Sequence, residues 1–163
     1  IFRGKNGLER RRDHTGHNAG GICSERRSLL DSLFFLSAGS KNRKAFAELF
    51  FENTFSTSIS RQDAGEYAQP LEMVRLAPSA VNKQPWRILK KDGMFHFYLC
   101  CAPGYNAFFG DVDMQRIDLG IAMFHFHACA HEAGHKGTWK IIDPGISPLP
   151  KRTHYCVSWV PQT

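Results

Sequence analysis

No stretch of the 163-residue sequence is apolar over the roughly 20 residues that a membrane-spanning helix needs. Charged Arg3, Lys5 and Glu9 interrupt the first residues, which is not the pattern of a signal peptide. The five cysteines form no C-x-x-C pair and are odd in number, so we expect reduced thiols rather than a disulfide framework. These absences favour a cytoplasmic protein with no membrane partner.

A basic stripe interleaved with aromatic residues is also missing. The net charge is +6, but the positive residues are scattered in short groups such as "ERRR" and "KNRK". Such a surface suits solvent or an anionic cofactor, for example a phosphate ester, and we expect no nucleic-acid partner. With 42% hydrophobic and 22% charged residues, the composition is that of an ordinary globular domain.

Hydrophobic residues recur at helical spacing in four segments. These are residues 26–37, the short piece 45–53, residues 61–77 and residues 113–134. The last is apolar on most sides and is therefore predicted to be buried, and Gly134 reads as its C-cap.

The helix over residues 61–77 carries its own boundary signals. Ser60 and Asp63 form a start that resembles a capping box, while Pro70 demands a kink or a break. Pro78 disfavours a helical conformation at Ala77, so the helix must end there.

Strands are predicted in the second half of the chain. Residues 87–91 and 94–100 are separated by Asp92-Gly93, a strong hairpin signal, and residues 137–142 and 153–160 are joined by a proline-rich loop. Helices would pack on an antiparallel-rich sheet, which is an α+β fold.

The connection "APSAVNKQPW", residues 77–86, is rich in side chains that form hydrogen bonds. Ser79, Asn82 and Gln84 offer donors and acceptors, Pro85 stiffens the exit, and Trp86 is the expected anchor to the core. A rigid loop of this kind suits a flat, polar heterocycle. It could equally be a plain connection whose polar groups satisfy their own backbone.

This stretch, as "RLAPSAVNKQPWRI", resembles the flavin-contacting signature of the nitroreductase family. Residues 41–99 and 113–141 resemble the branch of that family in which two halves lie in tandem on one chain and form a pseudo-dimer. Ordinary nitroreductases are true dimers with FMN at the interface. The resemblance covers roughly residues 25–160 and implies a nitroreductase-like α+β fold.

The resemblance also implies a function and a site. FMN would take a hydride from NAD(P)H and reduce a small-molecule electron acceptor, such as a nitroaromatic or quinone. The backbone around Ser79 and the amide of Gln84 would hydrogen-bond the isoalloxazine edge or the ribityl chain. No side chain need act as a catalytic acid or base, and no metal is implied. The residues expected to line the flavin are Pro78, Ser79, Ala80, Asn82 and Gln84.

Two parts of the family pattern are absent from the sequence. The arginine-rich R-R-S-x-R motif that grips the FMN phosphate is not present, and neither is a later glycine-rich stretch. We therefore interpret residues 25–163 as the C-terminal part of a nitroreductase-like domain that is truncated at its N-terminus. A missing N-terminal half or a homodimer partner would then complete the flavin site.

Residues 1–24 do not match the family and show almost no apolar periodicity. Permitted codons for residues 9–25, read one nucleotide later, give SDGETIPAITPVGYAA. That peptide resembles the G-E-x-x-P-A…P-x-G-Y run that the family carries before its "RRSLLD" helix. We predict that residues 9–24 are an out-of-frame translation without packed structure, and the coding DNA would test this.

Two alternatives to an intact oxidoreductase stay open. "HEAGH", residues 131–135, matches the H-E-x-x-H pattern of zinc hydrolases, although Gly134 is expected to end the helix before His135. The other alternative is a non-catalytic or defective flavin-binding or interaction fragment. His125 and His127 lie two residues apart and should face different sides of their helix, so they cannot share a metal.

Asp118 and Arg116 lie in the same predicted helix. Periodicity alone makes them surface or helix-pairing residues.

Overall fold

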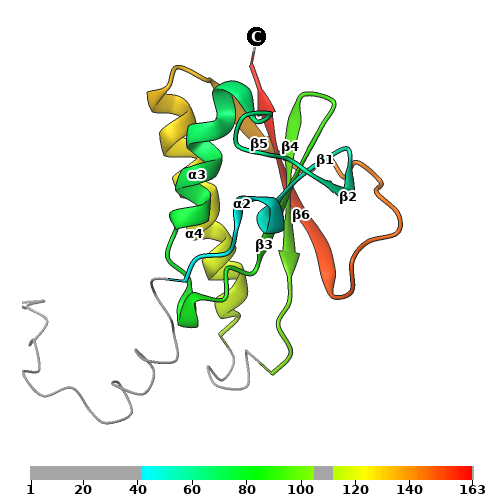
Figure 1. Cartoon of the computed structure of the whole chain (residues 1–163). Coiled ribbons are helices and arrows are strands. Elements are labelled where there is room, and N and C mark those ends of the chain that lie inside the picture. Colours follow the sequence, from blue (N-terminus) through cyan, green and yellow to red (C-terminus); the bar gives the residue numbers. More distant parts are fainter. Residues whose placement is uncertain (1–41, 105–111, 163) are drawn as a thin grey trace, which may run out of the picture.

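The structure, a computed structural model, describes residues 42–104 and 112–162 (Figure 1). The predictions for residues 1–24 and for a helix over 26–37 lie outside the described residues. The elements in chain order are α2 (Phe46–Leu49), β1 (Phe50–Glu52), β2 (Thr54–Ser58), the 3-10 turn η1 (Gly65–Tyr67), α3 (Ala68–Leu76), the 3-10 turn η2 (Ala80–Asn82), β3 (Trp86–Lys91), β4 (Met94–Cys100), α4 (Met114–Glu132), β5 (Gly137–Lys140) and β6 (Thr153–Pro161).

The strands form one six-stranded sheet in the order β2-β1-β3-β4-β6-β5. The β1–β3 pair is parallel, and the other four pairs are antiparallel. Asp92 and Gly93 close the β3–β4 hairpin with φ angles of 50° and 73°, the left-handed values that a two-residue hairpin turn requires. The predicted hairpin and the antiparallel-rich α+β fold are therefore confirmed.

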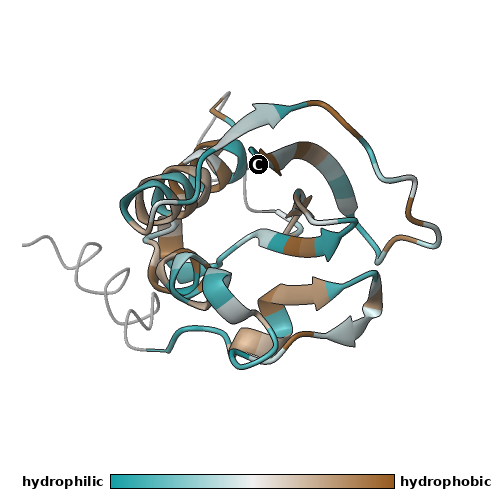
Figure 2. Cartoon of the chain, turned by 90° about the horizontal axis from the view of Figure 1, so that it is seen from above, coloured by the Kyte–Doolittle hydropathy of each residue, from teal (hydrophilic) through white to brown (hydrophobic). Residues whose placement is uncertain are grey.

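Helices α3 and α4 lie side by side on one face of the sheet (Figures 1 and 2). The core between the two layers is aromatic: the rings of Phe95, Phe97 and Trp159 surround Phe126 of α4 at centroid distances of 5.2–5.7 Å. Burying such rings is the main stabilising contribution of this interface. Away from the helices, the Phe55 ring of β2 packs on the Tyr98 ring of β4, and the Ser158 hydroxyl of β6 donates a hydrogen bond to the Ile142 carbonyl.

Only one face of α4 is buried, which corrects the prediction that the whole helix is buried. Leu119, Ala122 and Phe126 lie in the core, whereas the side chains on the outer face remain in solvent. Phe124 is 68% exposed and Ile117 is 49% exposed. The sequence is apolar on most sides of the helix because both faces carry apolar residues, but the described chain covers only one of these faces.

Both ends of α4 are capped. The Asp113 carboxylate accepts a hydrogen bond from the Arg116 amide at the N-cap. At the other end the Gly134 amide (φ 87°) donates a hydrogen bond to the His131 carbonyl, and the His135 amide donates to the Ala130 carbonyl. This is the Schellman arrangement. Gly134 thus ends the helix, as predicted.

The helix expected over residues 61–77 is shorter than predicted. Ser60 and Asp63 form the expected turn, in which the Asp63 amide donates to the Ser60 hydroxyl oxygen at 3.2 Å. A turn and η1 follow, and α3 begins only at Ala68. Pro70 therefore lies in the first turn of α3, where its missing N–H costs no helical hydrogen bond.

The helix expected over residues 45–53 is also wrong in its second half. Helix α2 has four residues, and the chain then becomes β1. Phe50 pairs with Ile88 of β3 in the parallel ladder and is almost fully buried. This tertiary pairing overrides the local helical spacing.

Candidate functional site

The loop predicted to be functional connects the end of α3 to the start of β3. Ala77 is extended (φ −55°, ψ 139°) and ends the helix, as Pro78 requires. Ser79 is the N-cap of η2, and Trp86 opens β3 with its side chain fully buried. The predicted anchoring role of Trp86 is confirmed.

Three residues of this loop have left-handed backbone conformations. The φ angles are 51° at Val81, 52° at Asn82 and 48° at Gln84. A left-handed conformation costs a non-glycine residue about 1–2 kcal/mol, and it is rare for a β-branched residue such as Val81. The loop therefore needs strong interactions to hold its shape.

The side chain of Gln84 supplies two of these interactions. It is 0% exposed, and its amide lies between two distant segments of main chain. The Gln84 side-chain nitrogen donates to the Arg75 carbonyl at 2.7 Å, and its oxygen accepts from the Lys44 amide at 2.7 Å. Both ends of the amide thus brace the loop against α3 and against residues that precede α2. A ligand could reach this amide only if those bonds broke.

Ser79 and Ala80 are fixed from within the loop and from α4. The Ser79 hydroxyl oxygen accepts a hydrogen bond from the Gln84 amide at 2.9 Å. The Ala80 amide donates to the Asp118 carboxylate, also at 2.9 Å. Asp118 is only 1% exposed, so of its two expected positions, on the surface or between helices, the surface position is wrong. Pro78, by contrast, is exposed, and Ser79 and Ala80 are half-buried.

Asn82 joins the loop to the start of the described chain. Its side-chain nitrogen donates to the Asn42 carbonyl at 2.9 Å, and its oxygen accepts from the Arg43 guanidinium. Burial and the nearby Arg75 guanidinium lower the pKa of Arg43. Arg43 thus brings a positively charged side chain to this end of the loop.

Arg75 is in turn paired with Glu72 one helical turn earlier, at 2.6 and 2.9 Å. This bidentate hydrogen bond lowers the pKa of Glu72 and raises that of Arg75. The pair fixes the last turn of α3, whose Arg75 carbonyl holds Gln84.

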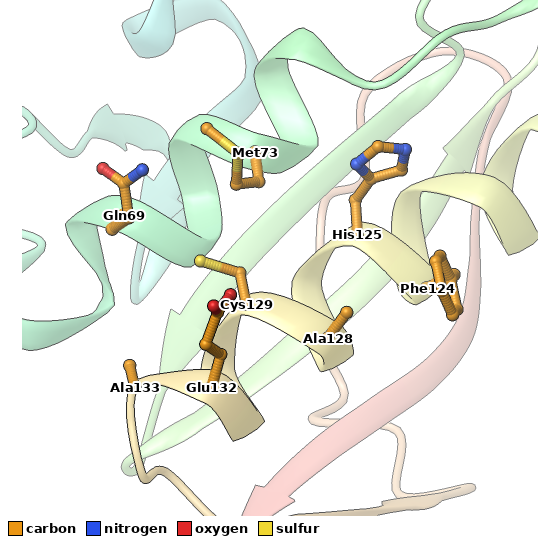
Figure 3. A pocket seen from close by; sticks show the side chains of 8 residues that line it. All are labelled: Gln69, Met73, Phe124, His125, Ala128, Cys129, Glu132 and Ala133. Atoms are coloured by element: carbon orange, nitrogen blue, oxygen red, sulfur yellow. The ribbon is translucent and has the colours of Figure 1, made fainter.

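Two of the pockets that the described residues form lie along α4. A groove of about 400 Å³ runs along the outside of α3 and α4, with Gln69 and Met73 on one helix facing Cys129 and Glu132 on the other (Figure 3). A second pocket, of about 570 Å³, lies between α4 and the sheet and contains Cys101 and Cys156. Burial raises the pKa of both thiols, so they are neutral at physiological pH and poor nucleophiles.

Neither of these pockets is lined by residues 78–84. The five predicted site residues thus lie together on one loop, but the side-chain amides of Asn82 and Gln84 bind the protein itself, and the Ser79 oxygen accepts a bond from within the loop. The residues that the sequence analysis missed are Arg43, the Lys44 amide, the Arg75 carbonyl and Asp118. The contacts from Arg43, Lys44 and Asp118 cross 38–40 residues of sequence, so no local pattern could have revealed them.

The histidine residues do not form a zinc site of the H-E-x-x-H type. His135 follows the end of α4 and stacks on Tyr67 at 4.7 Å, whereas His131 lies on the helix beside His127. His125 lines the outer groove and His127 packs on Trp159, so they face different sides, as predicted. Within residues 42–104 and 112–162, no three His, Cys, Asp or Glu side chains are grouped to hold a metal.

The described helices include none that is long and apolar enough to cross a membrane.

The fold and the loop together define an α+β domain with a strained, braced connection between a helix and a central strand. A family model described as "Putative TM nitroreductase" matches residues 38–130, more than half of the chain. The chain therefore belongs to this nitroreductase family. The matched region contains the whole loop and its bracing residues from Arg43 to Asp118.

The chain is also similar to the crystal structure of a "putative nitroreductase" from Thermotoga maritima, with 20% sequence identity and a TM-score of 0.48. The match covers 73% of this chain and 42% of the other, so the chain spans about two fifths of that protein's length. No curated protein matches the sequence significantly.

Proposed function

We propose that the chain forms part of the flavin site of an FMN-dependent, NAD(P)H-using oxidoreductase that reduces nitroaromatic or quinone-like acceptors. Membership of the nitroreductase family supports the reaction class. The observation that carries the proposed site is the strained loop after α3. Strained backbone that its surroundings over-determine is concentrated at ligand clamps and active sites.

The residues of the loop divide into two groups in this proposal. Asn82 and Gln84 hold the loop from behind through their amide groups. Pro78, Ser79 and Ala80 form the outer side and would contact the flavin. The Ser79 oxygen accepts from the Gln84 amide, but its hydrogen has no acceptor in the described part of the chain. That O–H is the loop's donor to a carbonyl or ring nitrogen of the flavin.

The donor set and charge of this region fit FMN. A serine hydroxyl and flanking apolar residues suit the edge of a flat polar ring. The Arg43 guanidinium beside the loop would attract the phosphate, whereas the charge of Arg75 is balanced by Glu72. When bound, FMN supplies the hydride chemistry, and the loop's part is to orient the ring.

The loop is not enclosed by either of the pockets described above, so a second surface must cover a flavin bound there. We propose that an N-terminal half or a second copy of the chain provides it. The described cysteines are free thiols, which is compatible with a proposed cytoplasmic location.

Titration of FMN into the purified chain tests this function, with quenching of flavin fluorescence as the signal. We expect saturable binding that Ser79→Ala weakens roughly three- to tenfold, the effect of one lost hydrogen bond. Ser58→Ala, at the exposed end of β2, is the matched control and should bind like the parent chain. Quenching no greater than that by the denatured chain would refute the proposal.

A second candidate function is a non-catalytic interaction fragment. The observation that favours it is the exposed apolar outer face of α4, with Phe124 and Ile117. Colour separates the candidates: an oxidoreductase copurifies with a yellow flavin, whereas a fragment is colourless and self-associates. Analytical ultracentrifugation of the parent chain and of Phe124→Ser measures that association.

A further inference from the structure

Asp118 of α4 is an almost completely buried carboxylate whose hydrogen bond reaches across 38 residues to the Ala80 amide. Burying a charged carboxylate is costly unless it is well hydrogen-bonded. We therefore expect the Asp118 carboxylate to have a specific structural role.

The Ala80 amide is a group that needs an outside acceptor. Ala80 is the first residue of η2, and the first amides of a helical turn have no partner within that turn. A carboxylate is a stronger acceptor than a neutral group, at about twice the strength. Asp118 therefore satisfies the start of η2 and ties it to α4.

This tie fixes the position of Ser79. Ser79 lies immediately before Ala80, its carbonyl accepts the Asn82 amide at 3.0 Å, and its hydroxyl oxygen accepts the Gln84 amide. Those contacts hold Ser79 within the loop, whereas the Asp118 bond ties this part of the loop to α4. Without it, the hydroxyl would keep its local partners and lose its place relative to the helical layer.

We propose that Asp118 is a positioning residue for the cofactor: it holds Ala80 so that the Ser79 hydroxyl and the outer side of the loop meet the flavin. This inference rests on the proposed function. Asp118 itself does not touch the flavin and acts only through the loop.

The chain offers a matched control on the same helix. Gln115 is also buried, at 4% exposure, and its side-chain oxygen accepts the Ala102 amide at 2.7 Å. It therefore makes the same kind of bond, from one turn earlier, to a different loop. Gln115→Ala should lower global stability much as Asp118→Ala does, but it leaves residues 78–84 in place.

The experiment compares Asp118→Ala, Asp118→Asn and Gln115→Ala in the full chain. Two readouts are measured: the Kd for FMN with the visible circular dichroism of the bound flavin, and hydrogen exchange of the amides of residues 78–84. We expect Asp118→Ala to weaken FMN binding about tenfold or more, to change the flavin dichroism and to accelerate exchange at Ala80. Asp118→Asn keeps an acceptor oxygen and should stay within about threefold of the parent Kd.

If Asp118→Ala does not fold, Asp118→Glu replaces it. The longer side chain keeps the charge but displaces the carboxylate, so it should bind FMN more weakly than Asp118→Asn does.

The outcomes separate the two proposals. If the parent chain binds FMN and Asp118→Ala binds equally well, or Gln115→Ala weakens binding as much, the positioning role is refuted and the proposed function stands. Failure of Asp118→Asn to restore binding also refutes it, because the bond would then not be the cause. If the parent chain does not bind FMN, the proposed function fails and the role of Asp118 fails with it.

Discussion

Gln84 is the residue whose removal should most clearly expose how the loop is held. Its side chain is fully buried, and Gln84→Ala deletes both of its hydrogen bonds at once. The substitution leaves the Lys44 amide without its acceptor and the Arg75 carbonyl without its donor. It also leaves a small void between α3 and the loop.

The size of the effect follows from these losses. A buried polar group that loses its only partner costs about 1–3 kcal/mol. Lys44 and Arg75 are half-buried, so water can reach part of the space, and we take the lower part of that range for each. The expected loss in the free energy of unfolding is about 2–4 kcal/mol, which for a chain of this size lowers Tm by roughly 5–15 °C.

Urea and thermal unfolding followed by circular dichroism measure this loss. Gln69→Ala on the exposed side of α3 is the matched control, with the same chemical change at a surface position. It should alter stability by less than about 0.5 kcal/mol. If Gln84→Ala is no more destabilising than Gln69→Ala, the two hydrogen bonds do not brace the loop and the reasoning is wrong.

Three further predictions concern the sheet and α4. Burial lowers the pKa of His96, so between that value and about 6.5 the unfolded chain binds more protons. The free energy of unfolding should therefore be highest above about pH 6.5 and fall as the pH drops below that value, which urea midpoints measured across this range will show. If His96→Asn has the same dependence of stability on pH as the parent chain, the prediction is wrong. A Cβ on Gly137 would lie 2.4 Å from the Trp159 ring, so Gly137→Ala should cost about 1–3 kcal/mol. Gly120 has open space in mid-helix, so Gly120→Ala should gain about 0.5–1 kcal/mol in the same thermal assay, and equal effects of the two would refute the packing argument.

Signals that act over a few residues were read correctly from the sequence. The Asp92-Gly93 hairpin, the helix end at Ala77 and the end of α4 at Gly134 all lie where local conformational preferences put them. These features depend on φ restrictions and missing donors, which a residue carries with it wherever it is placed.

Features set by distant partners could not be read in this way. Strand β1 was mistaken for helix because its parallel partner, β3, lies more than 30 residues away. The sequence showed that the Gln84 side chain has a donor and an acceptor. It did not show that these groups would bond to the Arg75 carbonyl and the Lys44 amide. Likewise, periodicity showed an apolar outer face on α4 without showing what, if anything, covers it.

The bonds from Asn42, Arg43, Lys44 and Asp118 to the loop have a consequence for the order of folding. Each joins partners separated by 38–40 positions, whereas the hairpin next to the loop needs only neighbouring residues. A contact between residues far apart in sequence closes a longer loop, which costs more chain entropy before the contact can stabilise the structure. The hairpin can therefore assemble early, while the loop acquires its shape only when residues 42–44 and Asp118 have both packed against it. Its protection from solvent should thus report completion of the native state rather than any intermediate stage.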